Sequence, residues 1–227
     1  AECKPGLRPG ARGHCTGAPG SLGRGMDFRD VTTWIFDLDN TLYPASANLF
    51  AMIDARIGEY VQRLLHCSAE EAHKVQKAYF HAHGATLYGL IQEHGTDPHD
   101  YLDYVHDVDM RVLEANEALV EALARLPGRK VVFSNGPTDY VQAVCRHLRL
   151  LPHLQQVFGV DRVGFHPKPE RRGYVRLLTQ LGRPPSRCIL VEDSLANLAE
   201  RFPIVTQVVV GTAGAVLALK VATIALG

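Results

Sequence analysis

The chain has 227 residues, enough for one domain with a full core and a sizeable insertion. Its 24 basic and 24 acidic residues balance, so no global field attracts it to a nucleic acid polymer or to an anionic membrane. The five cysteines are scattered without a C-x-x-C pair, which argues against a disulfide framework or a thiolate zinc site and favours a reducing, cytoplasmic location.

Residues 1–25 are rich in glycine, proline and arginine and contain no apolar run of the kind that a secretory signal needs. We expect this segment to be a disordered extension. Met26 stands directly before the first patterned sequence, which favours it as the natural start of the protein. An organelle transit peptide is the alternative interpretation of the extension.

Four short runs rich in β-forming residues predict strands at 33–36, 130–133, 188–191 and 205–210. Apolar residues in these runs are nearly continuous rather than alternating, which is typical of strands buried on both faces of a parallel sheet. The sequence therefore predicts an α/β fold built on a Rossmann-like parallel sheet.

The stretch between the first two predicted strands is much longer than one crossover helix requires, and its pattern is helical throughout. Apolar residues recur at helical spacing over 49–64. Ser68 with Glu71 predicts a capping box, and the Asp-Pro pair at 97–98 predicts a further helix start. We therefore expect residues 45–119 to form a helical subdomain inserted into the sheet.

Two helices and an apolar segment are expected in the C-terminal half. Thr138 is placed to cap a helix after the second strand, and residues 195–202 can form another after the third. Residues 204–226 are almost wholly apolar, with Lys220 as the only charge, and are long enough to span a bilayer. Glycines interrupt this run and its first part resembles a buried strand, so we expect a core strand and an apolar tail at 212–227 rather than a membrane anchor.

Two carboxylates follow the first strand, within W-I-F-D-L-D-N-T-L-Y-P at positions 34–44. Asp37 and Asp39 are therefore expected at the carboxyl edge of the sheet, where open α/β folds bind ligands. Two acids so close together repel each other unless a cation or a proton makes the pairing tolerable. The pair predicts a chemical role, and a turn that merely ends the strand is the structural alternative.

Loops after the other strands carry groups that complement this acidic pair. Ser134 and Asn135 offer a hydroxyl and backbone N–H groups at an expected helix N-terminus, which suits a phosphate. Lys168 lies in the proline-flanked loop H-P-K-P-E, and Glu192 and Asp193 end the third strand. Hard carboxylates suit Mg²⁺, and a lysine with N–H groups suits phosphoryl oxygens, so the sequence predicts a divalent cation facing a phosphoryl group.

Histidines and tyrosines are frequent in and near the expected helical subdomain. We assign surface or capping roles to the histidines, because their partners cannot be placed from the sequence, with metal binding or substrate contact as the alternative. The tyrosines are interpreted as core residues, with base stacking as the alternative, and they are Tyr43, Tyr88, Tyr101 and Tyr104.

The order D-L-D-N-T, F-S-N-G, P-K-P and V-E-D-S-x-x-N resembles the four motifs of the haloacid dehalogenase superfamily, over residues 28–211. The resemblance implies an α/β core at 26–44 and 120–211, with the helical insertion at 45–119 as the α-helical cap. W-I-F-D-L-D-N-T-L-Y-P, G-L-I-Q-E-H-G-x-D-P and Y-V-H-D-V-D most resemble the pyrimidine 5′-nucleotidase-like branch of this superfamily.

The resemblance also implies a role for each matching position. Asp37 would attack phosphorus and form an aspartyl-phosphate, while Asp39 would protonate the leaving oxygen and then take a proton from the hydrolytic water. Mg²⁺ would be held by the Asp37 carboxylate, the Asp39 backbone carbonyl and the Asp193 carboxylate, with Glu192 as an outer or alternate ligand. The phosphoryl oxygens would be held by Thr41, Ser134, Asn135 and Lys168.

The expected function is magnesium-dependent hydrolysis of a small phosphate monoester, such as a pyrimidine nucleoside 5′-monophosphate. Dehalogenases of the superfamily lack the second aspartate, so Asp39 favours phosphoryl transfer over dehalogenation. The alternatives within the superfamily are a phosphomutase and a phosphatase acting on a sugar phosphate or on phosphoglycolate. A phospho-acceptor receiver domain uses similar residues, but it has no large insertion after its nucleophile strand.

Overall fold

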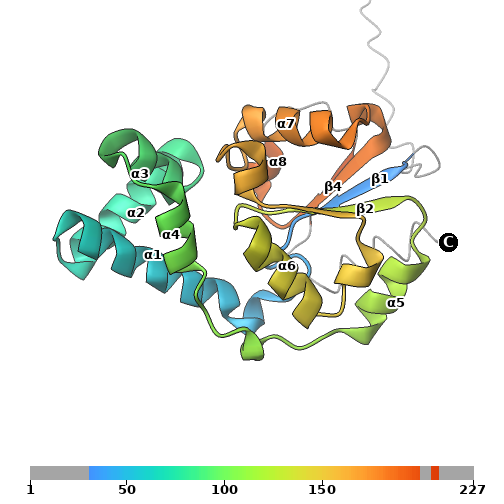
Figure 1. The fold of residues 1–227 in the computed structure, drawn as a ribbon, viewed down its shortest axis with the longest axis horizontal. Coiled ribbons are helices and arrows are strands. Elements are labelled where there is room, and N and C mark those ends of the chain that lie inside the picture. The colour runs from blue at the N-terminus through green and yellow to red at the C-terminus, as the bar shows by residue number, and fades with distance from the viewer. Residues whose placement is uncertain (1–30, 200–205, 210–227) are drawn as a thin grey trace, which may run out of the picture.

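The computed structural model describes residues 31–199 and 206–209, so the expected extension at 1–25 and the apolar tail at 212–227 lie outside the described residues. Within these two ranges, no helix has both the length and the apolarity that a bilayer crossing requires. The described chain forms a parallel sheet with helices on both faces, and a group of helices lies to one side of the sheet (Figure 1).

The sheet described by the structure has five parallel strands in the order β3-β2-β1-β4-β5. The strands are β1 (Thr33–Phe36), β2 (Arg129–Phe133), β3 (Gln156–Phe158), β4 (Cys188–Glu192) and β5 (Thr206–Val209). Phe36 is paired with Val132 of β2 and Val191 of β4, so these three strands end at a common edge. The chain order reverses between β1 and β4, and open α/β sheets bind ligands at such a point. The predicted α/β fold is confirmed.

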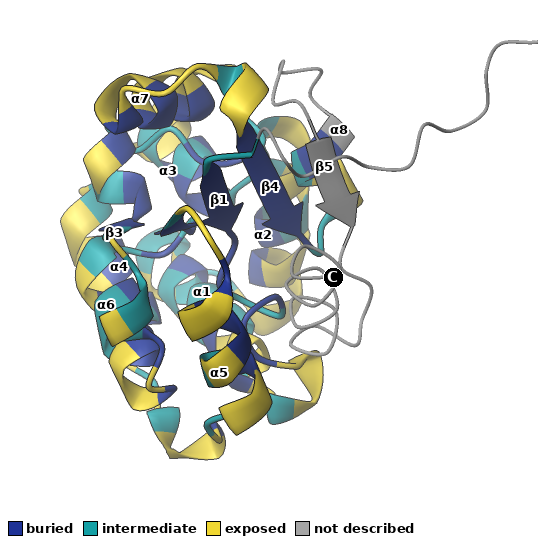
Figure 2. Ribbon diagram, turned by 90° about the vertical axis from the view of Figure 1, so that its right-hand side faces the viewer, coloured by how far each residue is buried: buried dark blue, intermediate teal, exposed yellow. Residues whose placement is uncertain are grey.

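Helices cover both faces of the sheet (Figure 1). On one side lie α5 (Glu117–Arg125) and α6 (Thr138–His147), and on the other lie α7 (Arg171–Leu181) and α8 (Leu195–Ala199). Successive side chains of a strand point to opposite faces, so Trp34 and Phe36 belong to one core and Ile35 belongs to the other. Figure 2 shows β1 and β4 buried along their whole length, as predicted for a sheet covered on both faces.

The helical insertion predicted after β1 contains α1 (Leu49–Leu65), α2 (Ala69–His83), α3 (Thr86–His94) and α4 (Pro98–Val105). The predicted capping box of Ser68 and Glu71 is present at the start of α2, and Asp97 caps α4 with Pro98 in its first turn. These four helices stand apart from the sheet, whereas α5 lies beside it (Figure 1). A division at residue 119 would cut α5, so we propose that the cap ends between α4 and α5.

Two details of the core differ from the sequence prediction. The strand β3 is not predicted, because its few residues begin with glutamine and carry a weak β signal. Thr138 is the first residue of α6 rather than its cap. The carboxylate of Asp161 accepts hydrogen bonds from Thr138 N at 2.7 Å and from Thr138 Oγ1 at 2.9 Å, so the 3₁₀ helix after β3 supplies the cap.

Short 3₁₀ helices complete the described chain. They lie at Ala45–Ala47, Met110–Val112, Leu151–His153, Val160–Val163 and Pro185–Arg187. One apolar core extends from the sheet into the cap, since Trp34 of β1 and Leu49 of α1 belong to the same cluster of buried side chains. The cap is therefore packed onto the core rather than joined to it by linkers alone.

Candidate active site

A buried ion cluster lies at the edge of the sheet where β1 and β4 end. Asp37 directly follows β1, and its backbone N–H donates to the carbonyl of Val191 at 2.9 Å. The Lys168 ammonium lies 2.5 Å from Asp37 Oδ1 and 2.7 Å from Glu192 Oε2. The exposed fractions are 5% for Asp37, 1% for Lys168 and 1% for Glu192. One buried cation is therefore shared by two buried carboxylates, which leaves an excess of negative charge.

The pKa values of this cluster reflect its burial first and that excess of charge second. Burial raises the pKa of Asp37 well above its ordinary value, and the charge of Glu192 raises it further, against the opposing effect of Lys168. Burial followed by the charge of Glu192 raises the pKa of Asp193 to about 6. Burial lowers the pKa of Lys168, but the two carboxylates outweigh this effect and the net pKa lies above its ordinary value. Lys168 is therefore a permanent cation here.

The same carboxylates can hold a metal ion. Asp37, Glu192 and Asp193 each place a carboxylate oxygen within 4.8 Å of the others. An all-oxygen ligand set suits a hard divalent cation. A cation at this point would also offset the charge excess that raises the pKa of Asp37 and Asp193. Coordination by the Asp39 backbone carbonyl stays a prediction.

The side chain of Asp39 lies beside the ion cluster and is held by hydroxyl groups. Tyr43 and Tyr140 donate hydrogen bonds to Asp39 Oδ1 at 2.7 and 2.9 Å. Ser134 Oγ donates to Asp39 Oδ2 at 3.2 Å and accepts from the N–H of Gly136 at 3.0 Å. The predicted acid and the predicted phosphate-binding serine are therefore in direct contact.

The sequence interpretation missed the two tyrosines. Tyr43 is assigned to the core from the sequence and is indeed only 1% exposed, but its hydroxyl binds Asp39. Tyr140 lies outside the sequence motifs, near the start of α6 and directly after the loop that contains Ser134. The signal that could find them is their position, since both follow a strand that ends at the active edge of the sheet.

Asn135 and Thr41, two predicted phosphate contacts, have more local surroundings. The backbone N–H of Lys168 donates to Asn135 Oδ1 at 2.7 Å, and Asn135 Nδ2 donates to the carbonyl of Lys168 at 3.1 Å. This reciprocal pair fixes the loop that carries Lys168. The Thr41 hydroxyl is fully buried and has no hydrogen-bond partner among the described residues. Contact of either residue with a phosphate stays a prediction.

A cleft of about 220 Å³ runs from Asp39 and Asn135 into the cap. Its walls are mainly apolar and aromatic, and they include Phe50, Ile53, Phe80, Leu87, Tyr88 and Phe165. A polar group at the cap end of the cleft consists of Asp54, Gln76 and Lys77, with Asp54 Oδ1 lying 2.7 Å from Gln76 Nε2 and 3.3 Å from Lys77 Nζ. The cleft thus joins the acidic site to a largely apolar pocket.

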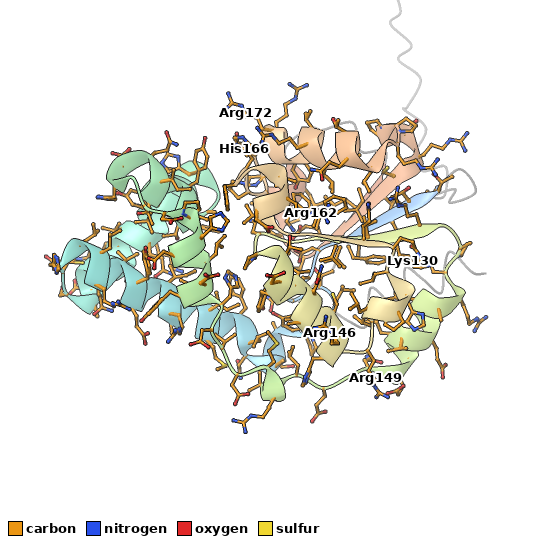
Figure 3. All side chains as sticks on the ribbon, in the orientation of Figure 1. Lys130, Arg146, Arg149, Arg162, His166 and Arg172 are labelled. Carbon is orange, nitrogen blue, oxygen red and sulfur yellow. The ribbon has the colours of Figure 1, made fainter. Side chains whose placement is uncertain are left out.

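The cap touches the core at the loop that carries Lys168. Gly84, between α2 and α3, has φ +78°, and a Cβ built there would lie 2.4 Å from Pro169 Cδ and 3.3 Å from the Lys168 carbonyl oxygen. Only glycine combines this backbone with so close an approach. Nearby, the ring of Tyr88 lies 6.4 Å from the ring of His166, which Figure 3 labels on the core side of this contact.

The fold recurs in solved structures. A haloacid dehalogenase-like family hydrolase from Streptococcus pneumoniae matches with a TM-score of 0.53 at 15% identity, over 85% of this chain and 91% of that chain. A phosphatase of this type from Thermococcus onnurineus gives 0.46 at 18% identity, over 73% and 79% of the two chains. L-2-haloacid dehalogenase from Xanthobacter autotrophicus gives 0.49 at 20% identity, over 78% and 76%. At these identities the likeness concerns the fold alone, and only the first of these matches has a TM-score above 0.5.

The family is established by the match between this sequence and a protein-family model. The model of the haloacid dehalogenase-like hydrolases matches residues 31–199, which contain every motif of the site. The chain belongs to this hydrolase family. The predicted superfamily is therefore confirmed, and placement in the pyrimidine 5′-nucleotidase-like branch stays a prediction.

Proposed function

We propose that the protein is a Mg²⁺-dependent phosphomonoesterase that forms an aspartyl-phosphate on Asp37. The observation that carries this proposal is the buried cluster in which Lys168 holds Asp37 at 2.5 Å and Glu192 at 2.7 Å. The ammonium fixes the Asp37 carboxylate and supplies positive charge where phosphoryl oxygens would gather. A Mg²⁺ ion held by Asp37 and Asp193, with Glu192 as an outer or alternate ligand, would neutralise further charge on the phosphoryl group.

The reaction proceeds in two steps on this assignment. In the first, an Asp37 carboxylate oxygen bonds to phosphorus, the ester P–O bond breaks, and Asp39 gives its proton to the leaving oxygen. In the second, water attacks the same phosphorus while Asp39 takes a proton from it. The bond between Asp37 and phosphorus breaks, which restores the carboxylate and releases inorganic phosphate. Binding of the phosphoryl oxygens is proposed for Ser134, Lys168, Thr41 and Asn135.

The cleft supports a nucleoside 5′-monophosphate as the substrate class, with a pyrimidine base preferred. Its largely apolar and aromatic walls fit a flat base, and its polar end at Asp54, Gln76 and Lys77 can discriminate base edges. The sequence resemblance to the pyrimidine 5′-nucleotidase-like branch points the same way. Sugar phosphates and phosphoglycolate are more polar and match these walls less well. We place the activity in the cytoplasm, because the described cysteines, Cys67, Cys145 and Cys188, are free thiols.

The test is phosphate release by the unmodified protein and by Asp37→Asn. The unmodified protein should release inorganic phosphate from uridine or cytidine monophosphate, in the presence of Mg²⁺ and without a bisphosphate activator. Asp37→Asn should abolish release while the fold and magnesium-dependent substrate binding persist. Asp107→Asn, a change at an exposed cap-side aspartate, is the control and should retain full turnover. Near-native turnover by Asp37→Asn would rule out the covalent mechanism, and a requirement for a sugar bisphosphate would indicate a mutase.

The substrate panel sets pyrimidine nucleotides against purine nucleotides, sugar phosphates and phosphoglycolate. We expect the highest kcat/KM for the pyrimidine nucleotides. A higher value for phosphoglycolate or a sugar phosphate would leave the phosphatase assignment intact and would refute the nucleotidase assignment.

A further inference from the structure

Two buried phenols bind the same oxygen of Asp39. Tyr43 and Tyr140 are 1% and 5% exposed, and their hydroxyls lie 2.7 and 2.9 Å from Asp39 Oδ1. The other oxygen, Oδ2, accepts one longer hydrogen bond of 3.2 Å, from Ser134 Oγ. The environment of the Asp39 carboxylate is therefore strongly asymmetric.

This asymmetry distinguishes the two carboxylate oxygens chemically. Each phenol has one hydroxyl proton, and both of these protons are directed at Oδ1. If Oδ1 itself were protonated, its proton would compete with the two hydrogen bonds that the phenols donate. Oδ2 lies on the side of Ser134, which follows β2 at the active edge of the sheet. Oδ2 is therefore the oxygen that can exchange a proton with a substrate bound in the cleft.

The phenols remain donors throughout. A tyrosine hydroxyl ordinarily ionises only at about pH 10, so both phenols keep the protons that they donate to Asp39 near neutral pH. The Tyr140 ring is itself fixed, since it packs on the ring of His106 with centroids 4.6 Å apart. His106 Nδ1 is in turn hydrogen-bonded to the carbonyl of Leu102 in α4 at 2.9 Å.

We propose that Tyr43 and Tyr140 are positioning residues that hold Asp39 Oδ1 and thereby direct Oδ2 at the leaving oxygen of the substrate. This inference rests on the proposed function. As the ester P–O bond breaks, the proton on Oδ2 passes to the leaving oxygen, and the carboxylate that results keeps both phenol hydrogen bonds. In the second step Oδ2 takes a proton from the attacking water. Neither tyrosine touches the substrate or exchanges a proton.

The test compares two leaving groups in Tyr43→Phe, Tyr140→Phe and the double variant. The leaving group of uridine 5′-monophosphate is the alcohol uridine, whose oxygen needs a proton as the P–O bond breaks. The leaving group of p-nitrophenyl phosphate is a stable phenolate, which needs none. The ratio kcat/KM reports the first step alone, because the ester P–O bond breaks in that step. Loss of one hydrogen bond to a charged group should lower kcat/KM on the nucleotide about 10-fold to 100-fold. The same variants should lose less than about 3-fold in kcat/KM on p-nitrophenyl phosphate, because its first step needs no acid. The value of kcat can fall on both substrates, because Asp39 is also the base of the second step.

Two comparisons separate positioning from general damage. Tyr60→Phe removes another phenol-to-aspartate hydrogen bond, of 2.8 Å to Asp100 in the cap, and should affect both substrates equally or not at all. In an Asp39→Asn background the tyrosine changes should add no further loss on the nucleotide, because the group that they position is gone.

Three outcomes would overturn the inference: equal losses of kcat/KM on the two substrates, no loss of kcat/KM on the nucleotide, or an undiminished tyrosine effect in the Asp39→Asn background. Failure of the unmodified protein to release phosphate from either substrate would instead overturn the proposed function. The comparison of Tyr43→Phe with Tyr140→Phe covers the case in which one variant unfolds, because each hydroxyl has its own hydrogen bond to Asp39.

Discussion

Replacing Lys168 by methionine tests the buried cluster with the smallest change in shape. Lys168→Met removes the ammonium that lies 2.5 Å from Asp37 and 2.7 Å from Glu192. Removing one partner of a buried ion pair lowers the free energy of unfolding by about 3–5 kcal/mol, and we call this loss the stability deficit of the variant. Because two carboxylates lose their shared counter-charge, we expect the upper part of this range, about 4–5 kcal/mol at pH 7.5 without Mg²⁺.

The loss should depend on pH in a definite direction. Burial already raises the pKa of Asp37, and removing Lys168 takes away the opposing effect, so the pKa rises further. A carboxyl group whose pKa is higher in the folded than in the unfolded state binds more protons when folded. The free energy of unfolding then falls as the pH rises from the unfolded value toward the folded one. The deficit of Lys168→Met should therefore be small near pH 4 and largest above pH 7.

Urea unfolding at pH 5 and pH 7.5 in a chelator measures this deficit. Lys130→Met is the matched control, because Lys130 (labelled in Figure 3) is also buried, whereas its ammonium donates to backbone carbonyls. Among the described residues these are the carbonyls of Leu126 and Gly128, at 2.8 and 3.2 Å. The deficit of Lys130→Met should be about 1–3 kcal/mol and the same at both pH values. A Lys168→Met deficit below about 1 kcal/mol at pH 7.5, or one that does not change with pH, would refute the reasoning.

Two further predictions concern the metal and the cap. Burial raises the pKa of Asp193 to about 6 and also raises that of Asp37, so ionisation above pH 6 destabilises the metal-free fold and Mg²⁺ offsets that charge. The increase in Tm caused by Mg²⁺ should be larger at pH 7.5 than at pH 5, and an equal increase at both would contradict metal binding by these carboxylates. Gly84→Ala should lower kcat/KM for the nucleotide about 10-fold, because its Cβ would displace the cap from Pro169. Gly95→Ala carries the same left-handed strain at φ +63° with nothing within 4 Å of its Cβ, so a loss as large in this control would attribute the Gly84 effect to strain alone.

Most of the fold is predictable from the sequence, because its elements are marked by continuous apolar runs, by helical spacing of apolar residues or by capping residues. The apolar strands β1 and β4 and the capped helices α2 and α4 carry strong local signals. β3 carries almost none, and the cap of α6 comes from Asp161, which lies 23 residues after Thr138.

The residues of the candidate site that lie at predicted strand ends or in recognisable motifs are predictable from the sequence. Strand ends in a parallel sheet meet at one edge, so the convergence of Asp37 and Glu192 follows from the predicted topology. The place of Lys168 beside them follows only from its motif, because the strand before it, β3, is not predicted. The roles of Tyr43 and Tyr140 do not follow, because a buried phenol and a core aromatic residue leave the same pattern in a sequence. Only the coordinates reveal that both hydroxyls reach one oxygen of Asp39.

The covalent step at Asp37 is tested most directly by trapping the phosphorylated protein. Asp39→Asn lacks the base for the second step, whereas p-nitrophenyl phosphate needs no acid for the first, so this variant should accumulate the aspartyl-phosphate. After acid quenching, mass spectrometry should find one phosphoryl group on the peptide that contains Asp37, and none when Asp37 is replaced by asparagine. A burst of p-nitrophenolate without that phosphopeptide, or with the phosphoryl group on another residue, would contradict the assignment of Asp37 as the nucleophile.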